Sequence, residues 1–233
     1  MKLEKITKRL RAARKDPTAR SYDDACGAAH ALDLIGERWA LLVMRELMFG
    51  PKRFSDLRAD LPGISANVLT QRLERLEEIG ALRRRKLPPP AASHVYELTP
   101  WGYEIEPALG VLGRWAARSP LHDPTLPLSA ASLMLSFKTM FDASRAKGLN
   151  ARIGFRIGDE TFLVHIHGGA CDAARQSLDG ADVVFAGPPT AIAAAVYGGA
   201  PLEALAAEKA LAIEGDRALA KRFTGLFPLP QKA

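Results

Sequence analysis

The chain has 233 residues and a formal net charge of +6, and its positive charge is unevenly distributed. Residues 1–120 hold 21 Lys and Arg against 15 acidic residues, whereas the remainder holds 11 of each sign. The length predicts two domains, and the charge asymmetry predicts a nucleic-acid-binding half joined to a neutral half. No apolar run is long enough to span a bilayer and the N-terminus lacks the core of a signal peptide, so we expect a cytoplasmic protein without membrane insertion.

Residues 1–20 form a basic arm with eight cations and two anions. Leu3, Ile6 and Leu10 in this arm have helical spacing. Three interpretations stay open, namely a helix that packs on a dimer, a segment that enters the minor groove, and a partly ordered solvated arm.

The two cysteines, Cys26 and Cys171, fall in different predicted domains, which favours a reducing compartment and argues against a structural disulfide. Cys26 precedes the first helix of the predicted DNA-binding domain. It can act as a redox switch if neighbouring cations lower its pKa, but Asp23 and Asp24 oppose thiolate formation. A buried, inert thiol is the alternative.

Residues 54–86 contain two amphipathic helical patterns separated by a turn at Pro62 and Gly63, followed by a short basic strand. Ser65 occupies the N-cap position of the second helix, because its hydroxyl can accept a hydrogen bond from a free backbone N–H of the first turn. An apolar stripe with helical spacing predicts the buried face of this helix, which comprises Leu69, Leu73 and Leu76, flanked by Val68 and Ile79.

The opposite face of this helix carries side chains that suit base edges and phosphates, namely Asn67, Thr70, Gln71 and Arg75. Glu74 and Glu78 share the face and repel phosphate, so we expect the N-terminal end of the helix to enter the groove. An ordinary amphipathic helix with a solvated polar face is the alternative interpretation.

A basic hairpin is predicted directly after this helix. Residues 81–87 and 94–98 are typical of short strands, and Pro88, Pro89 and Pro90 separate them. Two strands after a helix-turn-helix form a wing whose cations can contact phosphate or the minor groove, although a charge run is also typical of a solvated face. The predicted DNA-contacting residues are Lys52, Arg53, Ser65, Asn67, Thr70, Gln71, Arg72, Arg75, Arg83, Arg84, Arg85 and Lys86.

These motifs together resemble the HxlR-type winged helix-turn-helix regulators, relatives of the MarR group. The resemblance covers residues 26–118 and rests on the early cysteine and on IGERW, RFSDL, LPGIS, LTQRL, LERLEEIG and YELTPWG. It implies a homodimeric transcriptional regulator that binds a pseudo-palindromic operator in double-stranded DNA, with oxidation of the cysteine, here Cys26, as the signal in some members. The sequence departs from the family pattern at the wing loop, where three prolines precede Ala91, Ala92 and Ser93.

A further helical pattern starts with the cap Thr99 and with Pro100 at the first helical position, and it continues through Trp115. Its apolar residues exceed what packing on its own domain needs, so we predict that this helix forms the dimer interface. Three prolines in residues 119–128 then indicate a linker. The predicted organisation is a basic arm at 1–20, a winged helix-turn-helix domain with the dimerisation helix at 21–118, the linker at 119–128 and a second domain at 129–233.

The second domain is predicted to be α+β, with an antiparallel-rich sheet covered by helices. Helical spacing behind a Ser129 cap predicts a helix over residues 130–146, and alternation predicts strands over 151–157 and 161–167. His165 and His167 fall on the polar side of their strand, so we interpret them as solvent-facing and predict no metal site. The remaining pattern predicts a strand at 182–186, helices at 188–197 and 201–207, a strand at 210–214 and a closing helix at 216–226.

This second domain resembles the sterol carrier protein type two, or lipid-transfer, domain over residues 130–228, most clearly in GGAP, KALAIEGD and the final amphipathic helix. In that family a sheet covered by helices encloses an apolar tunnel, which implies a small apolar effector such as an acyl or sterol-like molecule. The same residues suit a packed core equally well. The candidate effector-binding residues are Phe137, Met140, Phe141, Phe155, Phe162, Val164, Val184, Val196, Tyr197 and Leu205.

The sequence therefore predicts a homodimeric DNA-binding regulator with a C-terminal domain for a small apolar effector. We find no nucleophile–base pair, no phosphate-binding glycine loop and no metal-ligand cluster in the sequence, so we expect neither catalytic activity nor a cofactor. Two alternatives stay open. The C-terminal domain can serve only assembly, with redox sensing through Cys26, or the protein can handle lipids with a weak enzymatic role.

Overall fold

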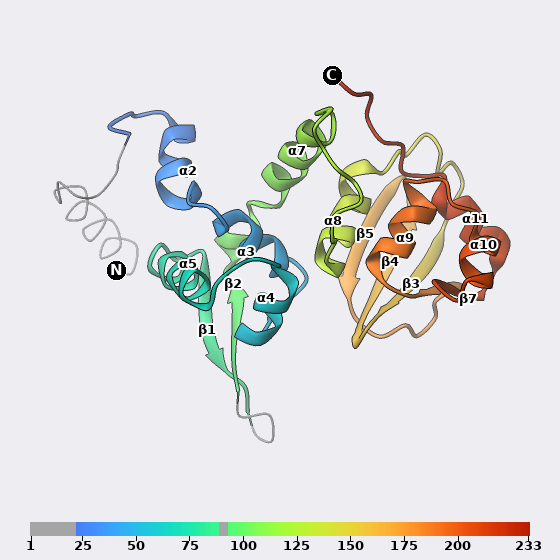
Figure 1. Ribbon diagram of the computed structural model, residues 1–233, viewed down its shortest axis with the longest axis horizontal. Helices are drawn as coiled ribbons and strands as arrows, with labels where there is room; N and C mark the ends of the chain where they lie inside the picture. The colour runs from blue at the N-terminus through green and yellow to red at the C-terminus, as the bar shows by residue number, and fades with distance from the viewer. Residues whose placement is uncertain (1–21, 89–92) are drawn as a thin grey trace. The chain divides into compact units, whose positions relative to one another are not determined.

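The computed structural model describes residues 22–88 and 93–233 (Figure 1). The predictions for the arm at 1–20 and for residues 89–92 of the wing loop lie outside these residues. The chain divides into two compact units, Met1–Glu106 and Pro107–Ala233, and each is described by itself. The predicted division lay at residue 118, so the helix that was expected to close the first domain falls in the second unit.

The first unit is a helical cluster followed by a β-hairpin. Its described elements are α2 (Gly27–Ile35), α3 (Ala40–Glu46), α4 (Phe54–Asp60), α5 (Ala66–Glu78), β1 (Leu82–Lys86), β2 (His94–Leu98) and α6 (Pro100–Tyr103). The strands β1 and β2 are antiparallel, with Leu82 opposite Leu98 and Lys86 opposite His94. In Figure 1 the hairpin extends away from α4 and α5.

The helix α5 forms as the sequence predicts. The Ser65 hydroxyl accepts a hydrogen bond from the Val68 N–H at 3.2 Å, so the N-cap is confirmed. Leu69, Leu73 and Leu76 are fully or almost fully buried. Truncating one such leucine to alanine costs about 2–5 kcal/mol, so this stripe fixes α5 on the rest of the unit.

The helix predicted over residues 99–115 is broken in two, and that prediction is wrong. The short helix α6 ends with an i→i+3 hydrogen bond from Glu104 N to Trp101 O, and α7 (Glu106–Ala117) starts anew two residues later. The Thr99 hydroxyl accepts from Gly102 N and donates to Gly80 O at 2.7 Å. A Cβ on Gly102 would lie 2.0 Å from Ala81 O, so α6 is held against the segment between α5 and β1.

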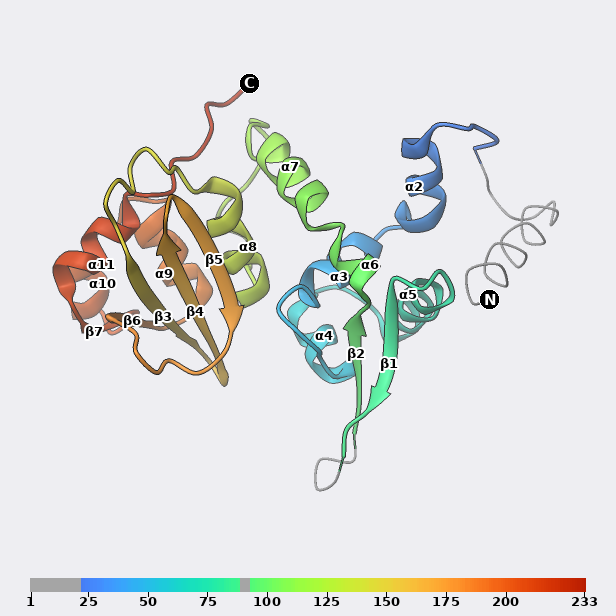
Figure 2. The ribbon, with the colours of Figure 1, turned by 180° about the vertical axis from the view of Figure 1, so that it is seen from behind.

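The second unit is α+β, as predicted. Its sheet has the order β5-β4-β3-β6-β7, and only the β3–β6 pair is parallel. The helices α8 to α11 cover one face, and Figure 2 shows the sheet from its other face. The elements after α7 are α8 (Ala130–Met140), β3 (Ala151–Ile157), β4 (Glu160–His167), β5 (Ala170–Arg175), β6 (Val183–Ala186), α9 (Pro189–Val196), α10 (Leu202–Ala207), β7 (Ala212–Gly215) and α11 (Arg217–Thr224).

Two features of this unit differ from the sequence prediction. The helix α8 ends at Met140 rather than near residue 146, because the Asp142 carboxylate accepts hydrogen bonds from the backbone and hydroxyl of Ser144 and stabilises a turn. The edge strand β5 was not predicted at all. Its ACDAAR sequence lacks an apolar alternation, and it is a strand because it pairs with β4.

The core of the second unit is a cluster of phenylalanine rings between the sheet and the helices. Phe137 of α8 lies 5.3 Å from Phe155, 5.3 Å from Phe223 and 4.9 Å from Phe227, measured between ring centroids. Phe185 stacks on Phe155 at 5.4 Å. The rings contact one another directly, so they form a packed interior.

Candidate nucleic-acid interface

The N-terminal half of α5 carries an exposed row of amide and hydroxyl side chains. Asn67, Thr70 and Gln71 are all exposed, whereas Ser65 is exposed but its hydroxyl is engaged in the helix cap. Arg75, one turn farther on, is half-buried and lies 3.4 Å from the Glu78 carboxylate. The first two turns therefore present hydrogen-bonding groups without a competing carboxylate.

Arg72 does not belong to this row. Its guanidinium forms an ion pair with Glu37 at 2.7 Å, and only 16% of its side chain is exposed. The side chain therefore links α5 to the loop before α3, and the prediction that Arg72 contacts DNA is wrong for this conformation.

Lys52 is a second correction. It was predicted to contact phosphate, but only 3% of the residue is exposed. Its ammonium forms ion pairs with Asp60 and with the buried Glu46, the latter at 3.3 Å. The backbone of Lys52 also exchanges two hydrogen bonds with Tyr96 of β2, at 3.0 and 2.9 Å. Lys52 thus joins α3, α4 and the hairpin inside the unit, whereas Arg53 beside it is exposed at the N-cap of α4.

The four wing cations divide into two pairs according to the faces of the hairpin. Arg83 and Arg85 lie on the same face as Glu97, and they contact its carboxylate at 2.6 and 3.2 Å. Partial burial acts to raise the pKa of Glu97, but the hydrogen bonds from Arg85 and Arg83 outweigh it and the pKa lies below its ordinary value.

The other two wing cations, Arg84 and Lys86, lie on the opposite face, next to Tyr96 and His94. Within the described residues, the side chains of Arg84 and Lys86 form no ion pair. Both residues are exposed. Arg84 and Lys86 can therefore bind a phosphate without first breaking an ion pair with Glu97.

The helix α7 has two distinct faces. Arg114 donates a hydrogen bond to Thr139 O at 3.1 Å, and a Cβ on Gly110 would lie 3.3 Å from the Thr139 hydroxyl, so one face rests on the end of α8. The other face exposes an apolar stripe, in which Val111 and Trp115 are each 71% exposed and Leu112 is 47% exposed. An exposed stripe of large apolar side chains is typical of a surface that contacts another molecule.

The two cysteines differ in exposure and in the direction in which the pKa of the thiol is shifted. Cys26 is exposed at the N-cap of α2, and the backbone N–H groups of Ala28 and Ala29 in the first turn lower the pKa of its thiol. The cause is the helix N-terminus rather than the neighbouring cations considered in the sequence analysis. Cys171 is buried, which raises the pKa of its thiol to about 12.

The ten candidate effector residues are not all brought together. Most of them lie in the layer between the sheet and the helices that cover it. Four of these residues are fully buried, namely Phe137, Phe155, Phe162 and Val164. Val184 lies on the opposite face of the sheet, because its neighbours Val183 and Phe185 point toward the core. Its inclusion is therefore wrong. The other five residues, buried or half-buried, are Met140, Phe141, Val196, Tyr197 and Leu205.

The core also holds residues that the effector prediction missed. Phe185, Phe223 and Phe227 complete the ring cluster, and all three are buried. The helical spacing of Phe223 in the final helix was the available signal. His165 and His167 lie on the far face of β4, where His165 is half-buried and His167 is exposed, as the alternation predicts. Among the described residues no helix is long and apolar enough to cross a bilayer.

Two helices joined by a tight turn, with the second helix followed by a two-stranded hairpin, define the first unit as a winged helix-turn-helix. Residues 34–122 match the profile of the HxlR-like helix-turn-helix family, and residues 135–228 match that of the SCP-2 sterol transfer family.

Several relatives match the first unit. The HTH-type transcriptional regulator YvaP of Bacillus subtilis is 37% identical over 86 residues, which cover 37% of this chain and 80% of that protein. YodB of the same organism is 35% identical over 37% of this chain and 77% of its own length. The regulator sll1512 of Synechocystis is 40% identical, and the match spans 62% of its length. The solved reduced form of YodB is similar with a TM-score of 0.39 and 31% identity, over 43% of this chain and 100% of that chain.

The chain therefore belongs to the HxlR-like helix-turn-helix family, and its second unit is an SCP2-type domain.

Proposed function

We propose that this protein is a transcriptional regulator that binds double-stranded DNA through α5 and the wing. The observation that carries the proposal is the exposed row of Asn67, Thr70 and Gln71 in the first two turns of α5. The wing adds Arg84 and Lys86, whose side chains form no ion pair with any residue that the structure describes. Amide side chains pair with adenine edges in the major groove, and cations hold the phosphates. Membership of the family and the names of its relatives as HTH-type transcriptional regulators support the proposal.

The test is selection of bound fragments from genomic DNA, followed by titration of one selected site with variants. Gln71→Ala is expected to relax sequence preference at one or two base pairs, at a cost of about 1–3 kcal/mol on the preferred site. Glu203→Gln, which changes an exposed carboxylate of α10 in the second unit, is a control for altered net charge. Equal binding of selected and random fragments by the unaltered protein would refute sequence-specific regulation.

We further propose that the protein is a homodimer formed through α7. The stripe of Val111, Leu112 and Trp115 supports this, because it stays exposed although the other face of α7 is docked on α8. A dimer with two copies of α5 suits a pseudo-palindromic operator with half-sites one helical turn apart. Sedimentation of Trp115→Asp is expected to give a monomer, whereas Arg118→Asp, nearby but outside the stripe, leaves the dimer intact.

For the SCP2-type domain we propose a small apolar effector, such as an acyl or sterol-like molecule. The support is the family match together with the apolar space between sheet and helices that the phenylalanine rings now occupy. A ligand there has to separate rings that contact one another, so binding would be linked to a change in packing of α8 and α11. Mass spectrometry of gently purified protein tests this. A stoichiometric apolar molecule supports a sensor, and its consistent absence favours a domain that serves only assembly.

A second candidate function rests on Cys26. Its thiol is exposed, at a helix N-terminus, with a lowered pKa, and these features favour the thiolate. We propose that a hydroperoxide oxidises this thiolate to a sulfenic acid, with release of water or an alcohol, and that DNA affinity changes as a result. Cys171 supplies the internal control, because it is buried with a raised pKa. Peroxide is expected to alter DNA binding of the unaltered protein and of Cys171→Ser, but not of Cys26→Ser.

A further inference from the structure

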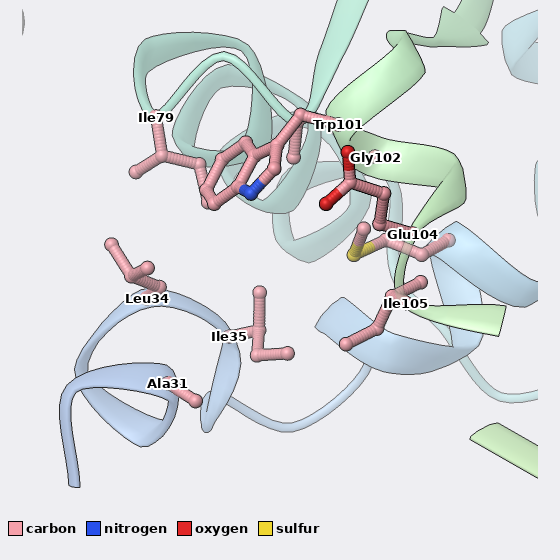
Figure 3. A pocket seen from close by; sticks show the side chains of 10 residues that line it. Ala31, Leu34, Ile35, Ile79, Trp101, Gly102, Glu104 and Ile105 are labelled. Carbon is pink, nitrogen blue, oxygen red and sulfur yellow. The ribbon is translucent and has the colours of Figure 1, made fainter. Parts of the chain in front are cut away.

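A pocket of about 240 Å³ opens in the winged-helix unit at the C-terminal end of α5 (Figure 3). Leu34 and Ile35 of α2 form one side of it, and Ile79 at the end of α5 forms another. Trp101 and Glu104, from α6 and its C-cap, and Ile105 form a third side, and the remaining lining residues are Ala31, Met44, Ala81 and Gly102. The walls are therefore apolar apart from one carboxylate.

Among the described residues of the lining, Glu104 is the one with an acidic or basic side chain. In Figure 3 it extends toward the indole of Trp101. Within the described residues, Glu104 forms no hydrogen bond or ion pair through its side chain. Trp101 is 48% exposed as a residue although it borders an apolar pocket. An aromatic ring and a carboxylate that line the same pocket attract a positive charge, and the carboxylate repels an anion.

We propose that this pocket binds a small organic cation with an apolar body, such as an aryl or short alkyl quaternary ammonium. The apolar body would contact Leu34, Ile35 and Ile79, and the cationic end would lie between the Trp101 ring and Glu104. A neutral ligand of the same shape would cover the carboxylate and leave it without a partner, which costs free energy. The volume lies slightly below the range of about 300–1,000 Å³ that is usual for drug-sized ligands, so the body is about one ring in size.

The pocket borders the element that the proposed function places on DNA. Ile79 is the C-cap of α5, and Ala81 of the lining precedes β1 directly. A ligand that prefers one position of these residues would change DNA affinity, and DNA would change ligand affinity by the same factor. This linkage rests on the proposed function, whereas binding of the cation does not.

The test is calorimetric titration of the full-length protein with phenyltrimethylammonium and with tert-butylbenzene, which has the same shape without the charge. We expect the cation to bind more tightly than its neutral analogue. Glu104→Gln should weaken binding of the cation by about fivefold or more, whereas binding of tert-butylbenzene should stay the same or tighten, because the carboxylate that it covers is gone. Glu203→Gln, an exposed carboxylate of α10, is the matched control and should change neither affinity.

Three outcomes would overturn the proposal: equal affinity for both probes, unchanged cation binding by Glu104→Gln, or no binding of the cation. In the last case, sedimentation of Trp101→Ala shows whether a second copy of the chain fills the pocket, since loss of the dimer would identify that occupant. Thermal unfolding of Glu104→Gln checks that the variant folds. Titration of the same variants with DNA, in the absence of the organic cation, tests the proposed DNA binding separately. The proposal for the pocket can therefore fail while the proposed DNA binding holds, and the reverse.

Discussion

The two units of this protein differ in whether the side chains proposed to bind a partner are exposed or buried. In the winged-helix unit the residues that suit a ligand, such as Gln71 and Arg84, are exposed, and the core beneath them is aliphatic. In the SCP2-type unit the distinctive residues are aromatic and buried, and they contact one another. The first unit therefore presents these side chains to a partner directly, whereas an apolar molecule that entered the ring cluster of the second unit would have to move the rings apart.

The largest expected effect comes from the aromatic core. Phe137→Ala removes a ring that contacts Phe155, Phe223 and Phe227, so it should lower the free energy of unfolding of the second unit by about 3–5 kcal/mol. Phe141→Ala is the matched control, because Phe141 is half-buried and its ring lies 6.1 Å from that of Phe227. Urea unfolding measures both. Similar losses for the two variants would contradict a single packed cluster centred on Phe137.

A loss of similar size is expected in the first unit from Lys52. Lys52→Met removes the ammonium that Asp60 and the fully buried Glu46 share, whereas Glu46 keeps its ion pair with Arg45, so the loss should approach the value of about 3–5 kcal/mol for a broken buried ion pair. The adjacent Arg53→Met changes an exposed side chain, so its effect should stay within about 0.5 kcal/mol. Urea unfolding followed by the fluorescence of the tryptophans reports both. If Lys52→Met instead weakened DNA binding at unchanged stability, Lys52 would be a phosphate contact.

The wing separates two kinds of cation, and the salt dependence of DNA binding can distinguish them. Arg84→Ala and Lys86→Ala should each weaken binding to all sequences and reduce the slope of log affinity against log salt by about one. Arg83→Ala should change the slope less, because that side chain is already neutralised by Glu97. Fluorescence anisotropy at several salt concentrations measures the slopes. Equal slope changes for Arg83 and Arg84 would show that the ion pairs with Glu97 open on DNA.

The smallest expected effect is the pH dependence of the wing. The pKa of Glu97 is lowered in the folded protein, so the stability that its carboxylate contributes is present above the ordinary glutamate pKa of about 4.3 and is lost as the pH falls through the lowered folded value. Glu97→Gln should therefore flatten the acid limb of the stability curve and leave the neutral region with a small constant loss. Thermal unfolding from pH 3 to pH 7, compared with Glu104→Gln, measures this difference.

Several elements followed from the sequence because their signals are local. The Ser65 cap, the leucine stripe of α5 and the alternation of β3 and β4 each lie within one short segment, and each was confirmed. The contacting residues were harder to predict. Lys52 and Arg72 looked like surface cations because their carboxylate partners, Glu46 and Glu37, are not adjacent to them in the sequence.

The pairing of the wing could have been inferred in part. In an antiparallel hairpin, residues directly opposite one another point to the same side, so Glu97 opposite Arg83 follows once the register is known. The register itself depends on the conformation of the loop that joins the strands. The length of the loop is not enough to predict that register. The same holds for β5, which has little strand character and exists through its partner β4.

The sequence by itself determined the two-domain plan, the winged helix-turn-helix with its capped α5, and the α+β character of the second unit. Periodicity and capping are enough for these features because they depend on neighbours a few residues apart. Only the tertiary structure decided which cations are paired, on which sheet face Val184 lies, and where the helix after Thr99 breaks. Those outcomes depend on groups that the fold brings together from distant parts of the chain. They also depend on the free-energy cost of burying a charge, which is offset only where an oppositely charged partner is present.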